Sequence, residues 1–357
     1  MFTIQTDPLL ASVVGSVLIV ATKPWHGRWT TRTAATGHST HSKSIPRVGG
    51  IAMLAGLVLA RYQQPDLLLL QHVVGLGLVV FGIGLIEDLT HSISARHRLF
   101  ICLIAGALAA GYGGYVVRGV GVPLVDAALG VHQVAVVFSA FAIAGLCSAV
   151  NMVDGKNGLA AGSVALSLAG VCALALQNGQ ADLAQSSVMF MYVIAGFLAI
   201  NWPWGRLFMG DCGAYLLGFA LALCLIDLAV ASKVSPWVSL VLVIYPVTEV
   251  LHSVWRRARS GQAIDSPDTL HLHNLVRDVV VDRVFAKLGK TSRNSCVAPL
   301  LLLMQLPSTA MAVAFAGSTG ILVAVALVHV VVQVAICEML ATKRAQLFAT
   351  RDFARAG

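Results

Sequence analysis

Charged residues are scarce in this chain of 357 residues, because Asp, Glu, Lys and Arg make up only 11% of it while hydrophobic residues make up 57%. Soluble domains carry about a quarter of their residues charged. Apolar runs separated by short polar stretches, with a mean hydropathy of +0.82, are typical of a helical protein that crosses a membrane several times. The runs lack the strict alternation of a membrane β-barrel.

Cysteine pairs and a signal peptide are also missing. The seven cysteines lie mostly within apolar runs and form no CxxC pair, which argues against a disulfide framework or a zinc site. No Lys or Arg precedes the apolar stretch 9–20, and no cleavage motif of small residues follows it. We therefore expect this stretch to remain as the first membrane helix.

The pattern of apolar runs predicts an all-α, polytopic membrane protein with about eleven transmembrane helices, in which residues 1–357 form a single integral membrane domain. The longest polar stretch, 253–295, is its main loop. The expected spans lie near 8–22, 48–61, 67–86, 99–117, 131–150, 158–176, 183–200, 213–231, 234–252, 296–316 and 319–340.

Basic residues predict the orientation of these spans. If the loop containing Lys23 to Arg47 is cytoplasmic, strict alternation leaves only Arg61, Arg118 and Lys233, of the 24 Lys and Arg residues, outside. Such a bias is the positive-inside pattern. It also explains the net charge of +8 by attraction to anionic headgroups, so no nucleic-acid partner is needed.

Acidic residues gather in short polar loops at the ends of the apolar runs. The loops contain Glu87 and Asp88, then Asp154, then Asp211, and finally Asp265 and Asp268 ahead of His271 and His273. A carboxylate at a membrane boundary is costly to bury without a cation or a hydrogen-bonded partner. The alternation places all of these loops on the cytoplasmic side. We interpret them as one metal-dependent phosphate site at that face.

Each acidic motif also has a local interpretation. Asp211 lies between Gly210 and Gly213 where a loop enters a helix, and as an exposed carboxylate it could serve only as a helix cap. Glu87 and Asp88 repel one another unless a cation or an arginine intervenes, and Arg96 or Arg98 could be that partner. Asp154 and Asn157 flank Gly155 in what could be an ordinary turn.

The histidines His271 and His273 are two positions apart and could not share one face of a regular helix. Their spacing suits a polar loop that grips a pyrophosphate with help from Arg256, Arg257 or Arg259. The alternative is a solvated loop, and neither histidine is expected to belong to the core.

Five motifs occur in one order along most of the chain: HSKSIPRVGG (41–50), GLIEDL (84–89), NMVDGKNGLAAG (151–162), RLFMGDCGAYLLGF (206–219) and SPDTLHLHNL (266–275). This series resembles the polyprenyl-phosphate N-acetylhexosamine-1-phosphate transferases, of the glycosyl transferase family 4 type. The resemblance implies a bacterial inner-membrane enzyme that transfers a sugar-1-phosphate from a UDP-N-acetylaminosugar to undecaprenyl phosphate and releases UMP. A homodimer is left open.

The resemblance also implies the cofactor and the roles of individual residues. The cofactor is Mg²⁺, with Mn²⁺ as an alternative, and oxygen ligands suit either ion. The implied catalytic residues are Glu87, Asp88, Asp154 and Asp211. The implied metal ligands are Asp211 and Asn151. The implied substrate-binding residues are His41, Arg98, Asn157, His271 and His273.

This chain departs from the family pattern at three places. Glu87 stands where two aspartates are usual, Asn274 ends the histidine run where relatives have another histidine, and the first loop has Thr33 and His38 where relatives carry an acidic residue and an arginine. Two rival functions remain. A muramoyl-pentapeptide transferase is disfavoured by the DSPD and HLHN sequences, and a secondary transporter should place its polar groups near the middle of the membrane in two related halves.

Overall fold

The computed structural model describes residues 6–31, 45–261 and 268–356, with side chains to residue 349. Within these ranges all regular secondary structure is helical. The first helices are α1 (Asp7–Ala21), α2 (Lys23–Thr30), α3 (Gly49–Gln63), α4 (Leu68–Thr90), α5 (Ala95–Gly111), α6 (Pro123–Leu129), α7 (His132–Val153) and α8 (Leu159–Gln177). The remainder are α9 (Ala181–Asn201), α10 (Gly210–Ala231), α11 (Trp237–Leu242), α12 (Ile244–Arg259), α13 (Leu272–Leu275), η1 (Val276–Val281), α14 (Asp282–Val284), α15 (Lys290–Ala314) and α16 (Thr319–Ala356).

These helices confirm the predicted class, an all-α multi-pass membrane protein. Each of the eleven predicted spans overlaps a helix. In the described residues seven helices are long and apolar enough to cross a membrane, or eight if α1 and α2, which meet at 87°, are one bent span. The predicted number of eleven is therefore not established.

The ninth predicted span, 234–252, differs from expectation because it is broken. The short helix α11 stops at Val243, whose backbone is not helical (φ −114°, ψ 19°), and α12 begins directly after it. Pro246 lies in the first turn of α12, where its missing N–H is no loss, but in a continuous helix it would remove a hydrogen bond. Helix α12 ends in three arginines, Arg256, Arg257 and Arg259.

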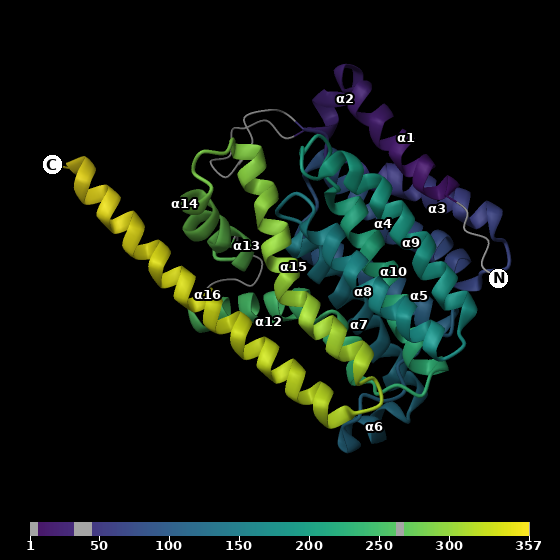
Figure 1. Ribbon diagram of the computed structural model, residues 1–357. Coiled ribbons are helices and arrows are strands. Elements are labelled where there is room, and N and C mark those ends of the chain that lie inside the picture. Colours follow the sequence, from purple (N-terminus) through teal and green to yellow (C-terminus); the bar gives the residue numbers. More distant parts are fainter. Residues whose placement is uncertain (1–5, 32–44, 262–267, 357) are drawn as a thin grey trace.

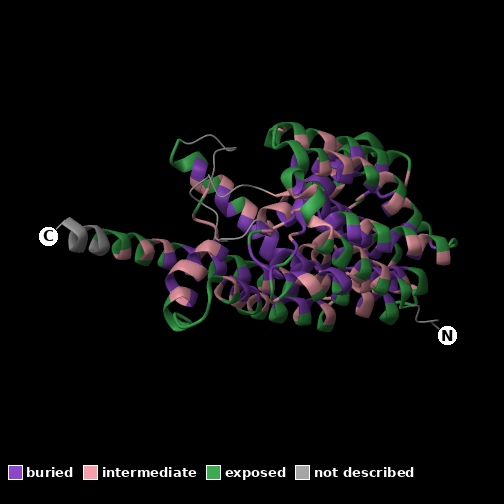
Figure 2. Cartoon of the chain, turned by 90° about the horizontal axis from the view of Figure 1, so that it is seen from above, coloured by how far each residue is buried: buried purple, intermediate pink, exposed green. Residues whose placement is uncertain are grey.

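Helix α10 is the centre of the bundle and packs against α3, α4, α7 and α8. In its most apolar window 78% of the residues are buried, and Figure 2 shows the buried residues concentrated in the interior of the bundle. Glycines allow this close packing. A Cβ on Gly84 of α4 would lie 2.5 Å from the Cys212 nitrogen, and one on Gly50 of α3 would lie 2.4 Å from the Gly213 nitrogen.

The second half of the chain adds a distinct group of elements beside this bundle. The predicted loop 253–295 is largely helical where it is described, with α13, η1 and α14 following the end of α12. Helix α16 packs against α12, α13 and α15, and its C-terminal half projects away from the rest of the molecule (Figure 1). The histidine motif, which runs into α13, therefore lies close to α16.

Candidate active site

A polar cavity of about 250 Å³ lies where the ends of several helices meet. It is bordered by the C-terminal ends of α4 and α7, the N-terminal ends of α5 and α10, and the segment before α3. The structure thus brings together three of the predicted loops where these helix ends meet. The lining residues are Arg47, Glu87, Asp88, His91, Arg98, Asn151, Asp154 and Asp211.

Asp88 caps the N-terminus of α10. Its Oδ1 accepts a hydrogen bond from the Asp211 amide and its Oδ2 accepts one from the Cys212 amide, both at 2.9 Å. The first amides of a helix have no partner within it, so an outside carboxylate stabilises them and the positive end of the helix dipole. The capping role considered for Asp211 therefore belongs to Asp88, since no side chain at the start of α10 itself makes a cap.

Asp211 is buried, with 8% of its surface exposed, which corrects the expectation of an exposed loop carboxylate. It lies in the first turn of α10 and is ion-paired with Arg98. The same guanidinium is 3.7 Å from Glu87, whose Oε2 accepts a hydrogen bond from the Ile93 amide at 2.8 Å. A single arginine therefore neutralises two carboxylates from separate helices.

Asp154 lies in the turn after α7, on the other side of the cavity. Burial, together with the negative charges of Asp211 and Asp88, raises the pKa of Asp154 to about 7, and the charge of Arg47 opposes this rise. At neutral pH this carboxyl group is poised between its two protonation states, as general acids and bases often are. Asn151, one turn earlier in the sequence, also lines the cavity.

The segment before α3 is held against the start of α10 by backbone hydrogen bonds. The Phe208 amide donates to the Pro46 carbonyl, and the Gly49 amide donates to the Phe208 carbonyl, each at 2.9 Å. Gly210 has φ +75°, and a Cβ there would meet the Arg47 carbonyl oxygen at 1.9 Å. Arg47 and His91, both lining the cavity, were not predicted as site residues; the only signal for Arg47 was its place in the motif 41–50. His41, predicted to bind substrate, lies outside the described residues.

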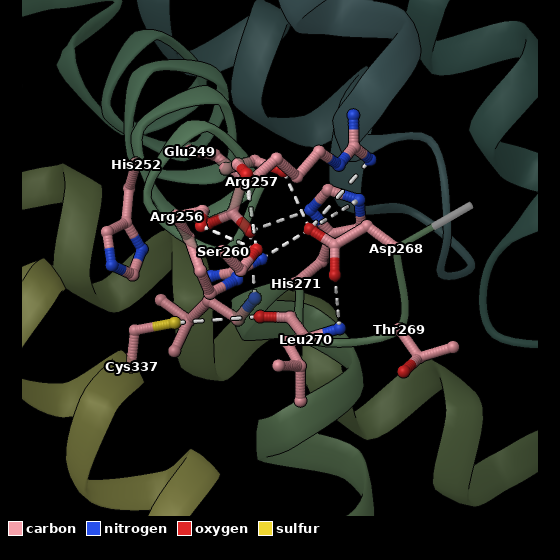
Figure 3. Close-up of polar contacts among 12 residues, drawn as sticks. Glu249, His252, Arg256, Arg257, Ser260, Asp268, Thr269, Leu270, His271 and Cys337 are labelled. Atoms are coloured by element: carbon pink, nitrogen blue, oxygen red, sulfur yellow. Dashed lines mark hydrogen bonds and ion pairs between the residues drawn. The ribbon is translucent and has the colours of Figure 1, made fainter. Parts of the chain in front are cut away.

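The histidine segment is anchored through Asp268 (Figure 3). Asp268 is ion-paired with Arg256 and lies 3.9 Å from Arg257, while the Ser253 hydroxyl donates to it at 2.6 Å. Burial alone would raise the pKa of Asp268, but the hydrogen bonds from Ser253 and the Leu270 amide, with the positive charges nearby, lower it to about 2. Arg256 and Arg257 thus orient this segment through Asp268.

His271 and His273 stack on each other with ring centroids 5.5 Å apart, because α13 begins between them. His273 is buried, with 3% exposed, which corrects the expectation that neither histidine would lie in the core. A Cβ on Gly155 would be 2.3 Å from His273 Nε2, so this ring packs directly on the turn that carries Asp154. His273 Nδ1 has no hydrogen-bond partner among the described residues.

Lys156 links the same turn to α13, and sequence reasoning did not identify it. Its buried ammonium group donates to Asn274 Oδ1 at 2.8 Å. Burial, with a further contribution from Arg277, lowers the pKa of Lys156 to about 7. Burial, followed by the charge of Lys156, lowers the pKa of His273 well below its usual range. An anionic ligand here would favour the protonated forms of both groups.

Asn157, predicted to contact uridine, lies away from the polar cavity. Its side-chain amide donates to the Ser295 hydroxyl at 2.9 Å, and its backbone amide donates to Asn294 Oδ1 at 2.9 Å. Both partners belong to α15, so Asn157 ties the 154–158 turn to that helix. A uridine contact by Asn157 stays a prediction.

The cavity suits a cation that needs few protein ligands. In the described ranges no three side chains of His, Cys, Asp or Glu are arranged to hold a metal together, which disfavours a closed structural site. Mg²⁺ usually takes one or two carboxylates and completes its octahedron with phosphate and water. Asp211 and Asn151 face the same cavity and fit that mode, with Arg98 as the group that neutralises Asp211 in its absence.

Comparison with known proteins agrees with these motifs. The model of glycosyl transferase family 4 matches residues 70–229. The chain is 30% identical over 246 residues to the undecaprenyl-phosphate alpha-N-acetylglucosaminyl 1-phosphate transferase of Yersinia pestis, a match that covers 66% of each chain. The chain belongs to glycosyl transferase family 4.

Other members of this family match over similar lengths. The Escherichia coli K12 protein of the same description is 28% identical over 246 residues. The decaprenyl-phosphate N-acetylglucosaminephosphotransferase of Mycobacterium tuberculosis is 29% identical over 275 residues. Each match covers 66% of this chain and 66% of the relative, so the chain spans about two thirds of the length of the curated relatives it matches.

Proposed function

We propose that this protein transfers an N-acetylaminosugar-1-phosphate from a UDP-sugar, UDP-N-acetylglucosamine or a related UDP-N-acetylhexosamine, to undecaprenyl phosphate. An oxygen of the lipid phosphate becomes bonded to the sugar-linked phosphorus, and the bond from that phosphorus to UMP breaks. UMP leaves and the product is a lipid-linked sugar diphosphate. Such a product starts a cell-surface glycan such as O-antigen or capsule.

One observation carries the proposal: the ends of α4, α5, α7 and α10, together with the segment before α3, bring four carboxylates and two arginines to a single polar cavity. The reaction joins phosphate groups that repel one another, so it needs positive charge and oriented carboxylates in one place. Names of the relatives support the same chemistry, because they describe N-acetylglucosaminyl 1-phosphate transfer to undecaprenyl or decaprenyl phosphate.

Each residue that lines the polar cavity has its own role in the proposed reaction. Arg98 and Arg47 attract the phosphate groups, and Asp154, with a pKa of about 7, can take or give a proton near neutral pH. The buried start of α10, whose first amides are capped by Asp88, provides a rigid base for Asp211. A bound Mg²⁺, held by Asp211 and Asn151, would supply neutralisation of the diphosphate charge.

An apolar cavity of about 490 Å³ supports a lipid acceptor. It is lined by residues of α7, α10, α11 and α12, among them Ala149, Leu225 and Leu240. Ala149 is only two positions from Asn151 of the polar cavity, so α7 borders both spaces. We infer that a prenyl chain lies along this apolar surface.

The bacterial inner membrane, with the site facing the cytoplasm, is part of the proposal. The cavity includes Arg47 and Arg98, and the positive-inside pattern assigns these basic ends to the cytoplasmic side. UDP-sugars are cytoplasmic metabolites, so a donor site on that face needs no transport of the donor.

The product distinguishes this reaction from ordinary glycosyl transfer. Purified protein in liposomes with undecaprenyl phosphate and Mg²⁺ would be offered a panel of labelled UDP-sugars, including UDP-N-acetylglucosamine, UDP-N-acetylgalactosamine and UDP-N-acetylmuramoyl-pentapeptide. We expect stoichiometric UMP with an N-acetylhexosamine donor. Stoichiometric UDP would refute the mechanism, and turnover of the pentapeptide donor alone would assign the protein to peptidoglycan synthesis.

A further inference from the structure

A row of buried polar side chains connects the α15 and α16 interface to the histidine segment. The Ser308 hydroxyl lies 2.7 Å from His329 Nδ1, and His329 Nε2 lies 3.1 Å from Gln333 Oε1. The Gln333 amide nitrogen then donates to Glu249 Oε2 at 3.2 Å. Each of these residues has 7% or less of its surface exposed. Polar groups buried this deeply are costly unless all of them are paired.

The hydrogen bonds in this row have one direction. The Gln333 amide nitrogen contacts two acceptors, the Tyr245 carbonyl and Glu249 Oε2, each at 3.2 Å. Its Oε1 must therefore accept from His329 Nε2, which carries the proton. His329 Nδ1 is then the acceptor of the Ser308 hydroxyl. Every donor points toward the carboxylate of Glu249.

Glu249 connects this row of hydrogen bonds to His271. Its Oε1 accepts the Leu272 amide at 2.8 Å and lies 3.2 Å from His271 Nδ1. A carboxylate can only accept, so His271 Nδ1 carries a proton. The other ring nitrogen, Nε2, is 3.9 Å from its nearest acid, Asp268, which is too long for a hydrogen bond. Figure 3 shows His271 between Glu249 and Asp268.

We propose that Glu249, held by Gln333 and His329 of α16, is a positioning residue that fixes His271 with Nδ1–H turned inward, so that Nε2, on taking up a second proton as the diphosphate binds, donates to a phosphate oxygen of the sugar nucleotide. The inference rests on the proposed function, because it names how the donor diphosphate is recognised. It makes α16 part of the substrate site although α16 contributes no side chain to the polar cavity. A fixed histidine tautomer is what a carboxylate partner supplies in many enzymes.

A matched control lies in α15. Gln305 is also a fully buried glutamine amide with several partners, since Oε1 accepts the Ser163 hydroxyl at 2.6 Å and Nε2 donates to the Ser167 hydroxyl at 3.1 Å. Its bonds lead to α8 and to the Leu242 carbonyl, not to Glu249. Gln305→Leu and Gln333→Leu should therefore cost similar stability while only Gln333→Leu disturbs His271.

Kinetics of the two variants test the proposal. For Gln333→Leu we expect KM for the UDP-sugar to rise roughly tenfold, with kcat changed much less, because a charge-assisted contact to the diphosphate is weakened. Gln305→Leu should keep the wild-type KM at an equal loss of melting temperature. Equal KM values in the two variants would overturn the proposal.

A second measurement needs no turnover. With ¹⁵N-histidine labelling, the ring-nitrogen shifts of His271, assigned from their loss in His271→Gln, should report protonated Nδ1 in the wild type and in Gln305→Leu. Gln333→Leu and Glu249→Ala should instead populate both tautomers. Unchanged shifts would refute the positioning role even if UMP is released. If the wild type releases no UMP while the shifts change as expected, the positioning holds and the proposed function fails.

Discussion

Arg98 on α5 is ion-paired with Asp211 in the first turn of α10, although 113 positions separate the two residues in the sequence. The pair places a positive and a negative group at the same point of the polar cavity. A phosphate that binds Arg98 releases Asp211, and a cation that binds Asp211 releases Arg98. Joint binding of a metal and a diphosphate is therefore favoured over binding of either alone.

Asp211→Asn should lower the transfer rate roughly thousandfold, because it removes the anionic oxygen best placed to hold Mg²⁺ at the diphosphate. It should also lower the melting temperature, since Arg98 loses a buried partner and keeps only Glu87 at 3.7 Å. The rate would be measured in a Mg²⁺ and Mn²⁺ titration. Asp227→Asn, near the other end of α10, is the control. A wild-type rate with the same metal requirement would remove Asp211 from the metal site.

Asp88→Asn should cost about 1 to 2 kcal/mol of stability, because an asparagine offers one acceptor oxygen to two helix amides. The lost cap also moves Asp211, so activity should fall more than folding. Thermal unfolding in detergent and the transfer assay would measure the two effects. Asp182→Asn, an exposed acidic residue in the first turn of α9, should change neither, and similar losses in both variants would contradict the capping role.

Gly84→Ala should destabilise the bundle by about 1 to 3 kcal/mol, because its new methyl group would overlap the backbone at Cys212. Gly82 lies on the same helix, and a Cβ there would meet nothing within 4 Å. Gly82→Ala should therefore be neutral or slightly stabilising. Equal melting temperatures for the two alanine variants would show that α4 and α10 do not approach as closely as described.

Asp154→Asn should separate stability from activity. The folded-state pKa of about 7 lies above the unfolded value near 3.9, so the wild type loses stability as pH rises from about 4 to 7. The variant has no carboxyl group at this position, so it does not lose stability in this pH range. In EDTA it should melt at a higher temperature than the wild type at pH 8 and at the same temperature at pH 4, while its transfer activity is lost. A gap that widens toward pH 4 would contradict the sign of this shift.

Lys156→Met should show the opposite pH dependence. The folded-state pKa of about 7 lies below the unfolded value near 10.4, so the wild type gains stability as pH rises from about 7 to 10. At pH 7 the variant should melt at a higher temperature than the wild type, and the difference should close by pH 10. If Lys156 helps to bind the diphosphate, the KM of the variant for the UDP-sugar should rise. Melting temperatures that differ by the same amount at every pH would show that the ammonium group of Lys156 is in solvent.

The sequence predicted the helices well because membrane spans are encoded locally. Each expected span overlaps a helix, and the loops with Glu87, Asp154 and Asp211 meet at one cavity, whereas the histidine segment, expected at the same site, does not line it. The break at Val243 was missed because its flanks are as apolar as a continuous span.

The partners of each site residue could not be predicted, because they come from distant parts of the chain. Asp88 caps a helix that starts 122 positions later, at Gly210, and Asn157 bonds to α15 rather than to the cavity. Spacing within one motif contains no information on these contacts. The same holds for Glu249, which lies in no recognised motif and is identified only by its bonds to Gln333 and His271.

The central position of α10 has a consequence for how the protein is made. During synthesis α10 emerges after α3, α4, α7 and α8, the helices that surround it, so its docking places can already be in the bilayer when it arrives. Its small surface exposed to lipid means that it gains little by staying at the edge of the growing bundle. A nascent chain that ends before residue 210 would hold these four helices and still lack the element on which the cavity is built.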